Sequence, residues 1–239
     1  MQQFASQPRN LVKAAAKSGA IIRGLHMTFA APTVIELLHE SLDFAYIDGE
    51  HGCFDLRDVE TACITAERHG LTAIARVPDA SSGTILRFLD RGVQGIVAPH
   101  IESVQQARDV VDVTYYAPLG NRSFGGGRPA FLLAPDKPAF MRACNAEMSL
   151  CLMLESRAGL EAAGAIAAVE GVDYLSFGMM DVAQSYGHPG NPGHAEVRQA
   201  VERAGAAIRA AGKRVREDFM RFGWVNDILV AGMKQIMPA

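Results

Sequence analysis

The feature that most constrains this chain is a regular alternation of short apolar runs with longer helical patterns along its 239 residues. The apolar runs, such as FAYI, TAIA, GIVA and SLCLML, have the length of buried strands. The segments between them space apolar residues as an amphipathic helix does. Strands alternating with helices form a parallel sheet with right-handed crossovers. Six clear units, a weak seventh and an eighth strand predict a (β/α)8 TIM barrel of the α/β class rather than an open sheet.

The C-terminal region departs from this pattern. KRVRE is a poor buried strand for the seventh position, and VNDILVAG is the expected eighth strand. The sequence stops soon after that, so we expect a barrel with a shortened C-terminal region. No change of composition and no Pro/Ser-rich linker divides the chain, which predicts a single barrel domain over residues 1–239.

Charge and cysteine content limit which partners and which cellular location we expect for this protein. The chain has 23 basic and 26 acidic residues, a net charge of -3 and no run of five like charges, so neither nucleic acid nor an anionic membrane is an expected partner. Its apolar stretches are shorter than the roughly 18 residues of a spanning helix. The N-terminus lacks a secretory signal, and the four cysteines form no CxxC pair. These features predict a cytoplasmic protein whose partners are small molecules or other proteins.

Ionisable side chains follow the expected strands at the end where a barrel carries its active site. They are Asp48, Glu50 and His51 after FAYI, Arg76 after TAIA, His100 after GIVA, Glu155 after SLCLML, and Asp181 after DYLSFG. Any one of them alone is more often a helix cap or a solvated loop residue, and His100 is equally compatible with capping its loop. Together they indicate a site for a divalent metal and a small anion, because carboxylates suit hard cations and Arg suits carboxylates.

Other conspicuous residues have simpler interpretations. The stretch FGGGRPA lacks the Lys-Ser/Thr of a P-loop, and we expect it to form a loop over the barrel mouth. Met179 and Met180 suit pocket lining better than a hard cation, and Cys53 is expected to be a small buried apolar residue. No lysine ends a candidate strand, which disfavours Schiff-base chemistry.

Several motifs together carry a family resemblance. They are IDGEHG, ARVPD, LDRGVQGIVAPHIESVQQARDVV, YYAPLGNRSFGGGRPA, LMLES and FGMMDVAQSYGHPGNPGHAEV, spread over most of the chain. In these motifs the sequence resembles the HpcH/HpaI aldolase family of class II, metal-dependent pyruvate aldolases. The resemblance implies a (β/α)8 barrel and reversible cleavage of 4-hydroxy-2-oxo acids to an aldehyde and pyruvate, or a similar 2-oxo acid such as hydroxypyruvate. It also implies a homo-oligomer, a hexamer or trimer of dimers.

The same resemblance implies roles for individual residues. Glu155 and Asp181 match the protein ligands of a Mg²⁺, Mn²⁺ or Co²⁺ ion. Arg76 matches the arginine that contacts the 2-oxo acid, and Gly178, Met180 and Asp181 match the turn whose amides hold the substrate carboxylate. Among the catalytic positions, His51 matches the histidine of proton transfer, Asp48 matches the acid that supports this histidine, and Asp90 matches a further acid.

Two departures from the family pattern leave alternatives open. Gly178-Met179-Met180-Asp181 stands where members have Gly-Pro and a small residue, and about a dozen residues are missing between KRVRE and FMRFGW. The closing helix, which in relatives often packs on a neighbouring subunit, is expected to be shortened. The alternatives are an oxaloacetate decarboxylase or other 2-oxo acid lyase on the same site, and a catalytically weakened barrel that binds a small oxo acid.

Overall fold

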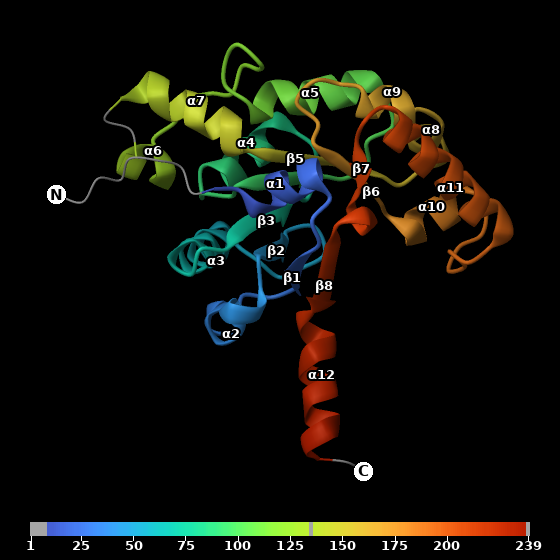
Figure 1. Cartoon of the computed structure of the whole chain (residues 1–239), viewed down its shortest axis with the longest axis horizontal. Coiled ribbons are helices and arrows are strands. Elements are labelled where there is room, and N and C mark those ends of the chain that lie inside the picture. Colours follow the sequence, from blue (N-terminus) through green and yellow to red (C-terminus); the bar gives the residue numbers. More distant parts are fainter. Residues whose placement is uncertain (1–8, 134–135, 238–239) are drawn as a thin grey trace.

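The computed structural model describes residues 9–133 and 136–237, and it confirms the predicted barrel-type fold with eight parallel strands. The strands curl into one sheet in the order β7-β6-β5-β4-β3-β2-β1-β8 (Figure 1). Their bounds are β1 Ile22–Met27, β2 Phe44–Asp48, β3 Thr72–Arg76, β4 Gly95–Ala98, β5 Ser149–Leu154, β6 Tyr174–Phe177, β7 Arg214–Val215 and β8 Met220–Trp224.

Helices cover the outside of the curled sheet. Several begin at side chains suited to that position: Asp55 forms a capping box at α3, and serines cap α4, α5 and α8. Within the described residues no helix is long and apolar enough to cross a membrane. The helices are α1 Leu11–Ser18, α2 Pro32–Leu38, α3 Leu56–Arg68, α4 Ser82–Leu89, α5 Val104–Thr114, α6 Arg128–Leu133, α7 Lys137–Glu147, α8 Arg157–Glu161, α9 Ala163–Ala167, α10 Met179–Ser185, α11 Ala195–Ala210 and α12 Val225–Ile236, with 3-10 turns η1 His39–Ser41 and η2 Arg216–Asp218.

Two apolar cores lie on opposite faces of the sheet. Side chains alternate along each strand, so β2 sends Phe44 and Tyr46 to the interior, and Ala45 and Ile47 to the layer beneath the helices. Helix α1 packs against the interior core and covers the N-terminal ends of the strands. By the same alternation Asp48 continues the interior row of β2, which points its carboxylate into the mouth of the barrel.

The C-terminal region differs from the prediction in two ways. The segment VNDILVAG is not a strand: it lies in helix α12, and the eighth strand is the preceding Met220–Trp224. The missing residues remove the crossover helix between β7 and β8, which are joined by η2 alone. Among residues 9–133 and 136–237, strand β7, with 2 residues, pairs only with β6, and β8 pairs only with β1, so these two strands are the edges of an open seam.

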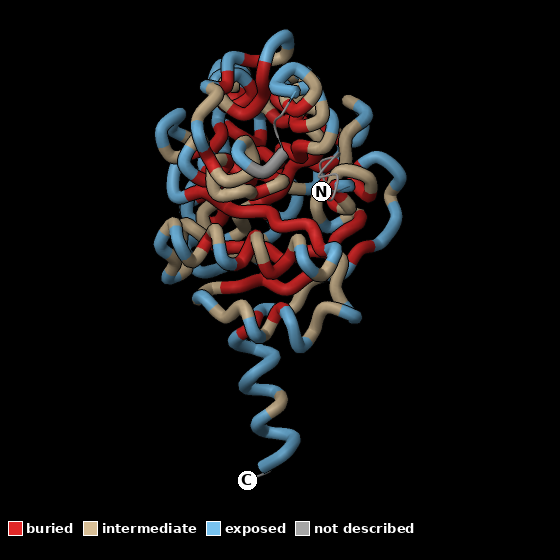
Figure 2. Tube along the Cα trace, turned by 90° about the vertical axis from the view of Figure 1, so that its left-hand side faces the viewer, coloured by how far each residue is buried: buried red, intermediate tan, exposed pale blue. Residues whose placement is uncertain are grey.

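Helix α12 projects away from the body of the molecule (Figures 1 and 2). It has 12 residues, so the closing helix is present although the region before β8 is short. Within this helix only Val225 is buried, and apolar side chains of its later turns are exposed, among them Leu229, Met233 and Ile236. The apolar residues that suggested a strand therefore belong to a helix, and on the isolated chain most of its apolar side chains are exposed to solvent.

The glycine-rich stretch lies at the other end of the barrel from the position predicted for it. A Cβ on Gly127 would lie 2.7 Å from the carbonyl oxygen of Asp90, which caps the C-terminus of α4. A helix that follows a strand runs back toward the N-terminal end of the barrel, so this contact places the stretch there. The prediction of a loop over the mouth of the same chain is wrong.

Candidate active site

The predicted strand-end residues meet at one edge of the sheet. Asp48 and Arg76 end β2 and β3 and are register partners, and Glu155 directly follows β5. Asp181 lies in the first turn of α10, just beyond β6. The parallel strands therefore bring these four side chains from four segments to the C-terminal end of the barrel, as the sequence predicted.

Asp48 and Arg76 form the centre of the arrangement. Arg76 donates from Nε to Asp48 Oδ1 at 3.0 Å and from Nη2 to Oδ2 at 2.6 Å, a bidentate pair between buried groups. His26 contacts the same Oδ2 through Nε2 at 3.0 Å, and the His51 amide donates to Oδ1 at 3.1 Å. Burial alone would raise the pKa of Asp48, but the hydrogen bonds from His26, Arg76 and the His51 amide hold it below its ordinary value.

The turn after Asp48 folds back closely over the strand ends. Gly49 donates its amide to the Arg76 carbonyl, and a Cβ at Gly49 would lie 2.7 Å from that oxygen, which explains the glycine. The turn directs Glu50 onto Arg76, with its Oε2 3.0 Å from Nη1, so both oxygens of Asp48 and one of Glu50 surround the guanidinium. The His51 side chain is 67% exposed and reaches only to 4.0 Å from Glu50. Asp48 therefore accepts from the main chain of His51, whereas its side-chain partners are Arg76 and His26.

His100 belongs to this cluster as well. Its Nε2 lies 3.3 Å from Glu50 Oε1, its Nδ1 lies 3.4 Å from Glu155 Oε2, and its amide donates to the same Glu155 oxygen at 2.8 Å. His100 is a non-glycine residue with positive φ, 55°, an uncommon conformation that is often found at functional positions. It places the imidazole between two carboxylates from neighbouring segments.

Glu155 is buried and closely enclosed. A Cβ at Gly178 would lie 2.1 Å from Glu155 Oε1, so only glycine leaves room for the carboxylate there. Burial raises the pKa of Glu155, the amide and imidazole of His100 lower it, and the Glu50 and Asp181 carboxylates raise it further. The Glu50 and Asp181 carboxylates thus add negative charge near Glu155, and carboxylate oxygens suit a hard divalent ion.

The turn before Asp181 has a free helix terminus. Gly178 is the N-cap of α10 and provides no side-chain hydrogen bond to the first amides of the helix. Met180 lies in this first turn with 57% of its surface exposed, while Met179 packs partly against the outer core. The first turn of α10 therefore begins beside Glu155, because Gly178 directly precedes it.

Asp90 lies apart from these residues. It caps the C-terminus of α4, and its Oδ1 is 3.9 Å from Arg122 Nη2, beside the glycine-rich stretch. That is the N-terminal end of the barrel, so Asp90 and Arg76 do not share a site within one chain. Cys53 also differs from expectation, because it is exposed.

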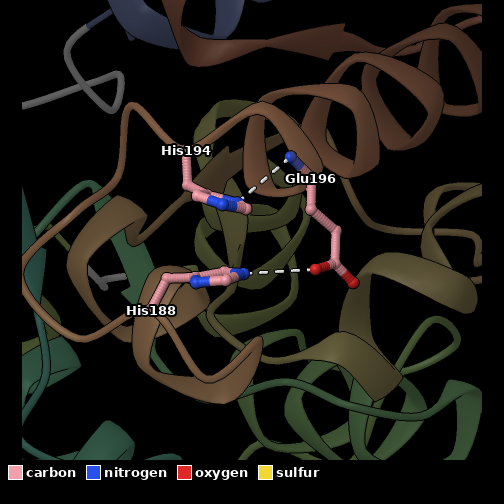
Figure 3. Close-up of side chains that lie close together, drawn as sticks. All are labelled: His188, His194 and Glu196. Carbon is pink, nitrogen blue, oxygen red and sulfur yellow. Dashed lines mark hydrogen bonds and ion pairs between the residues drawn. The ribbon is translucent and has the colours of Figure 1, made fainter.

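A second cluster lies on the segment between α10 and α11 (Figure 3). His188, His194 and Glu196 place possible ligand atoms within 4.8 Å of one another. The two rings stack with centroids 3.5 Å apart at 22°, so their in-plane lone pairs run side by side and do not converge on one point. His194 Nδ1 accepts from the Glu196 amide at the start of α11, and Glu196 also pairs with Arg157. These contacts account for the cluster as a helix cap with an ion pair.

Sequence reasoning missed or underrated three residues of the mouth. Glu50 and His100 were candidates without an assigned role, although the structure joins them to Arg76 and Glu155. His26 was not considered at all. The available signal was a single imidazole in the otherwise apolar strand GLHM, at an interior-facing position.

Comparisons with known proteins identify the family of this chain. A family model described as HpcH/HpaI aldolase/citrate lyase matches residues 24–221. A hydroxypyruvate/pyruvate aldolase of Roseovarius nubinhibens is 34% identical over 86% of this chain and 80% of its own length. A 4-hydroxy-4-methyl-2-oxoglutarate aldolase of Chaetomium globosum is 36% identical over 85% and 77%, respectively. The crystal structure of a HpcH/HpaI aldolase/citrate lyase family protein from Burkholderia cenocepacia superposes with a TM-score of 0.86 at 26% identity, covering 95% of this chain and 98% of that one.

Proposed function

Because this chain belongs to the HpcH/HpaI aldolase/citrate lyase family, we propose that it reversibly cleaves 4-hydroxy-2-oxo acids at the mouth described above. The protein is an aldolase, a carbon–carbon lyase of the aldehyde-lyase type that produces pyruvate. The proposed donors are pyruvate or a similar 2-oxo acid such as hydroxypyruvate, and the other substrate is an aldehyde. The observation that carries the proposal is Arg76, held rigidly by Asp48 beside Glu155 at the strand ends.

We propose that Glu155 and Asp181 hold a divalent cation, Mg²⁺, Mn²⁺ or Co²⁺. The fit rests on the raised pKa of Glu155 among neighbouring carboxylates and on the space that Gly178 leaves for it. Two carboxylates leave most coordination positions of such an ion open for a small ligand. When bound, the ion supplies positive charge beside the keto oxygen of the substrate.

The residues of the chain have distinct proposed tasks in cleavage. A base removes the proton from the C4 hydroxyl, the C3–C4 bond breaks, and its electron pair enters the pyruvate enolate. Arg76 faces the oxygen on which negative charge develops, which stabilises the transition state more than the ground state. His51, whose side chain is exposed at the mouth, transfers the proton. The turn Gly178–Asp181 holds the substrate carboxylate through the amides of Met180 and Asp181.

The experiment is a measurement of pyruvate release from a panel of 4-hydroxy-2-oxo acids, with and without chelator. Activity should disappear with EDTA and return with Mg²⁺ or Mn²⁺. Glu155→Gln should abolish the response to metal, whereas Glu102→Gln, an exposed glutamate nearby, should leave it unchanged. Full activity after chelation would refute the metal assignment. Oxaloacetate in the same panel tests decarboxylation on the same site, and an inactive protein that still binds the acids would indicate a weakened barrel.

We also propose that the chain forms a homo-oligomer, a hexamer or trimer of dimers. The support is helix α12, whose apolar residues are exposed on the isolated chain. Assembly bears on Asp90, because this acid can take part in catalysis only in the site of a neighbouring subunit. The cytoplasmic location, and the absence of nucleic-acid and membrane partners, stay predictions from composition.

A further inference from the structure

His26 occupies a buried position next to Asp48, the partner of the proposed substrate arginine. Its strand β1 lies between β8 and β2, and the register pairs His26 with Trp224 on one side and Tyr46 on the other. The three side chains form a row of stacked rings in the interior of the sheet. The His26 ring centroid is 3.7 Å from that of Trp224 at 15° and 4.5 Å from that of Tyr46 at 28°. His26 is 4% exposed, so its ring is fixed on both faces.

The two nitrogens of this ring have different surroundings. Nε2 lies 3.0 Å from Asp48 Oδ2, the oxygen that also accepts from Arg76 Nη2. Nδ1 is buried, and no hydrogen-bond partner for it is found among the described residues. Since an ionised carboxylate can only accept, the proton is assigned to Nε2, and Nδ1 is left as an unused acceptor. A second proton on Nδ1 would be buried without an acceptor, so the imidazole is a fixed neutral donor and not a proton carrier.

We propose that His26 is a positioning residue that acts on the substrate through Asp48 and Arg76. This inference rests on the proposed function, in which Arg76 contacts the 2-oxo acid. The Asp48 carboxylate can rotate about its Cβ–Cγ bond, and from the main chain the amides of Glu50 and His51 restrain Oδ1 alone. The His26 donor restrains Oδ2, the oxygen that holds the Nη2 end of the guanidinium. Removing this donor frees the plane of the carboxylate, and the Arg76 fork turns with it.

The contribution of the donor can be separated from that of the ring. His26→Phe keeps an aromatic ring between Tyr46 and Trp224 but removes the hydrogen bond. His26→Gln gives up the stacking but carries an amide N–H at about the distance of Nε2 from the main chain. A purely structural role of the ring predicts that His26→Phe is the milder change, whereas a positioning role predicts that His26→Gln is.

The test uses oxalate, a planar mimic of the pyruvate enolate, titrated into the Mg²⁺-loaded full-length protein, together with the KM for pyruvate in aldol addition. His26→Phe should weaken oxalate binding and raise this KM about tenfold, the order expected for one hydrogen bond to a charged group. His26→Gln should stay within about threefold of the wild type by the same measure. In an Arg76→Ala background, His26→Phe should have no further effect on oxalate binding, because the group through which it acts is gone.

A histidine outside the mouth serves as the control for the loss of an imidazole. His39→Phe removes an imidazole in η1, before β2 at the opposite end of the strands, and should change neither quantity. Normal oxalate binding by His26→Phe, or an equal additional loss in the Arg76→Ala background, would overturn the positioning role alone. A wild-type protein that fails to bind oxalate with Mg²⁺ present would refute the proposed function and this inference with it.

Discussion

Replacing Asp48 by Asn isolates the contribution of the buried carboxylate at the centre of the mouth. The carboxylate is fully buried and accepts from His26, from two nitrogens of Arg76 and from the amides of Glu50 and His51. An Asn side chain has a similar shape but no charge, and one of its two polar atoms would direct N–H groups at existing donors. The substitution therefore leaves the buried Arg76 charge with Glu50 as its remaining carboxylate partner.

The expected cost follows from this loss of pairing. Breaking a buried ion pair by removing one partner typically costs about 3–5 kcal/mol. For a chain of this size each kcal/mol lowers Tm by about 2–4 °C, so Asp48→Asn should lower Tm by roughly 6–20 °C. Activity should fall as well, because Arg76 loses the bidentate contact that fixes its plane.

The assay is thermal unfolding followed by circular dichroism, with Asp43→Asn as the matched control. Asp43 Oδ2 accepts one amide hydrogen bond at the exposed start of β2, and an Asn oxygen can replace it. The control should therefore change Tm by no more than about 2 °C, as surface substitutions usually do. If Asp48→Asn also unfolds within about 2 °C of the wild type and stays active, the buried pair is not what holds the mouth together.

Three further predictions follow from separate parts of the structure. Gly178→Ala should push the Glu155 carboxylate aside and weaken Mg²⁺ binding by about 10–100-fold in calorimetric titration, whereas Gly83→Ala, which meets no neighbour, should bind normally. Because the pKa of Asp48 is lowered in the folded state, its stabilisation is present above the unfolded value of about 3.9 and is lost as pH falls further, so the Tm difference between wild type and Asp48→Asn should narrow from pH 7 to pH 3. Met233→Lys on the exposed face of α12 should reduce the mass of the assembly in light scattering, and an unchanged mass would exclude that face from the interface.

The fold was predictable because the barrel signal is repeated. Each strand and helix pair is a weak indication alone, but their regular alternation fixes both the parallel sheet and the end at which polar residues gather. Asp48, Arg76, Glu155 and Asp181 were located in this way, from their order along the chain alone. The prediction was wrong for the last part of the chain, where one strand and helix repeat is incomplete. There VNDILVAG was assigned to a strand, because the eighth strand had to be placed without a helix before it.

Which side chains contact one another was harder to predict from the sequence than which end of the barrel they occupy. The sequence placed Asp48 beside His51, but it does not reveal that the imidazole points to solvent while His26, on another strand, takes the carboxylate. The partner of Asp48 depends on the register between β1 and β2 and on which residues of β1 face the interior of the barrel. Asp90 shows a related limit: a motif gives its identity but not the end of the barrel at which it lies.

The open seam between β7 and β8 leaves the proposed chemistry intact because of where the site residues originate. The residues proposed to bind metal and substrate and to transfer the proton come from β2, β3, β5 and β6 and the turns after them, all within the continuously paired part of the sheet. From the seam strands, Phe222 and Trp224 contact His26 with their rings, and Trp224 makes the closer, stacked contact. Since β8 still pairs with β1 over five residues, that ring stays in register even though the crossover helix before β8 is missing. The missing helix therefore removes covering from the outside of the barrel while the mouth keeps its geometry, which favours an active aldolase over a weakened barrel.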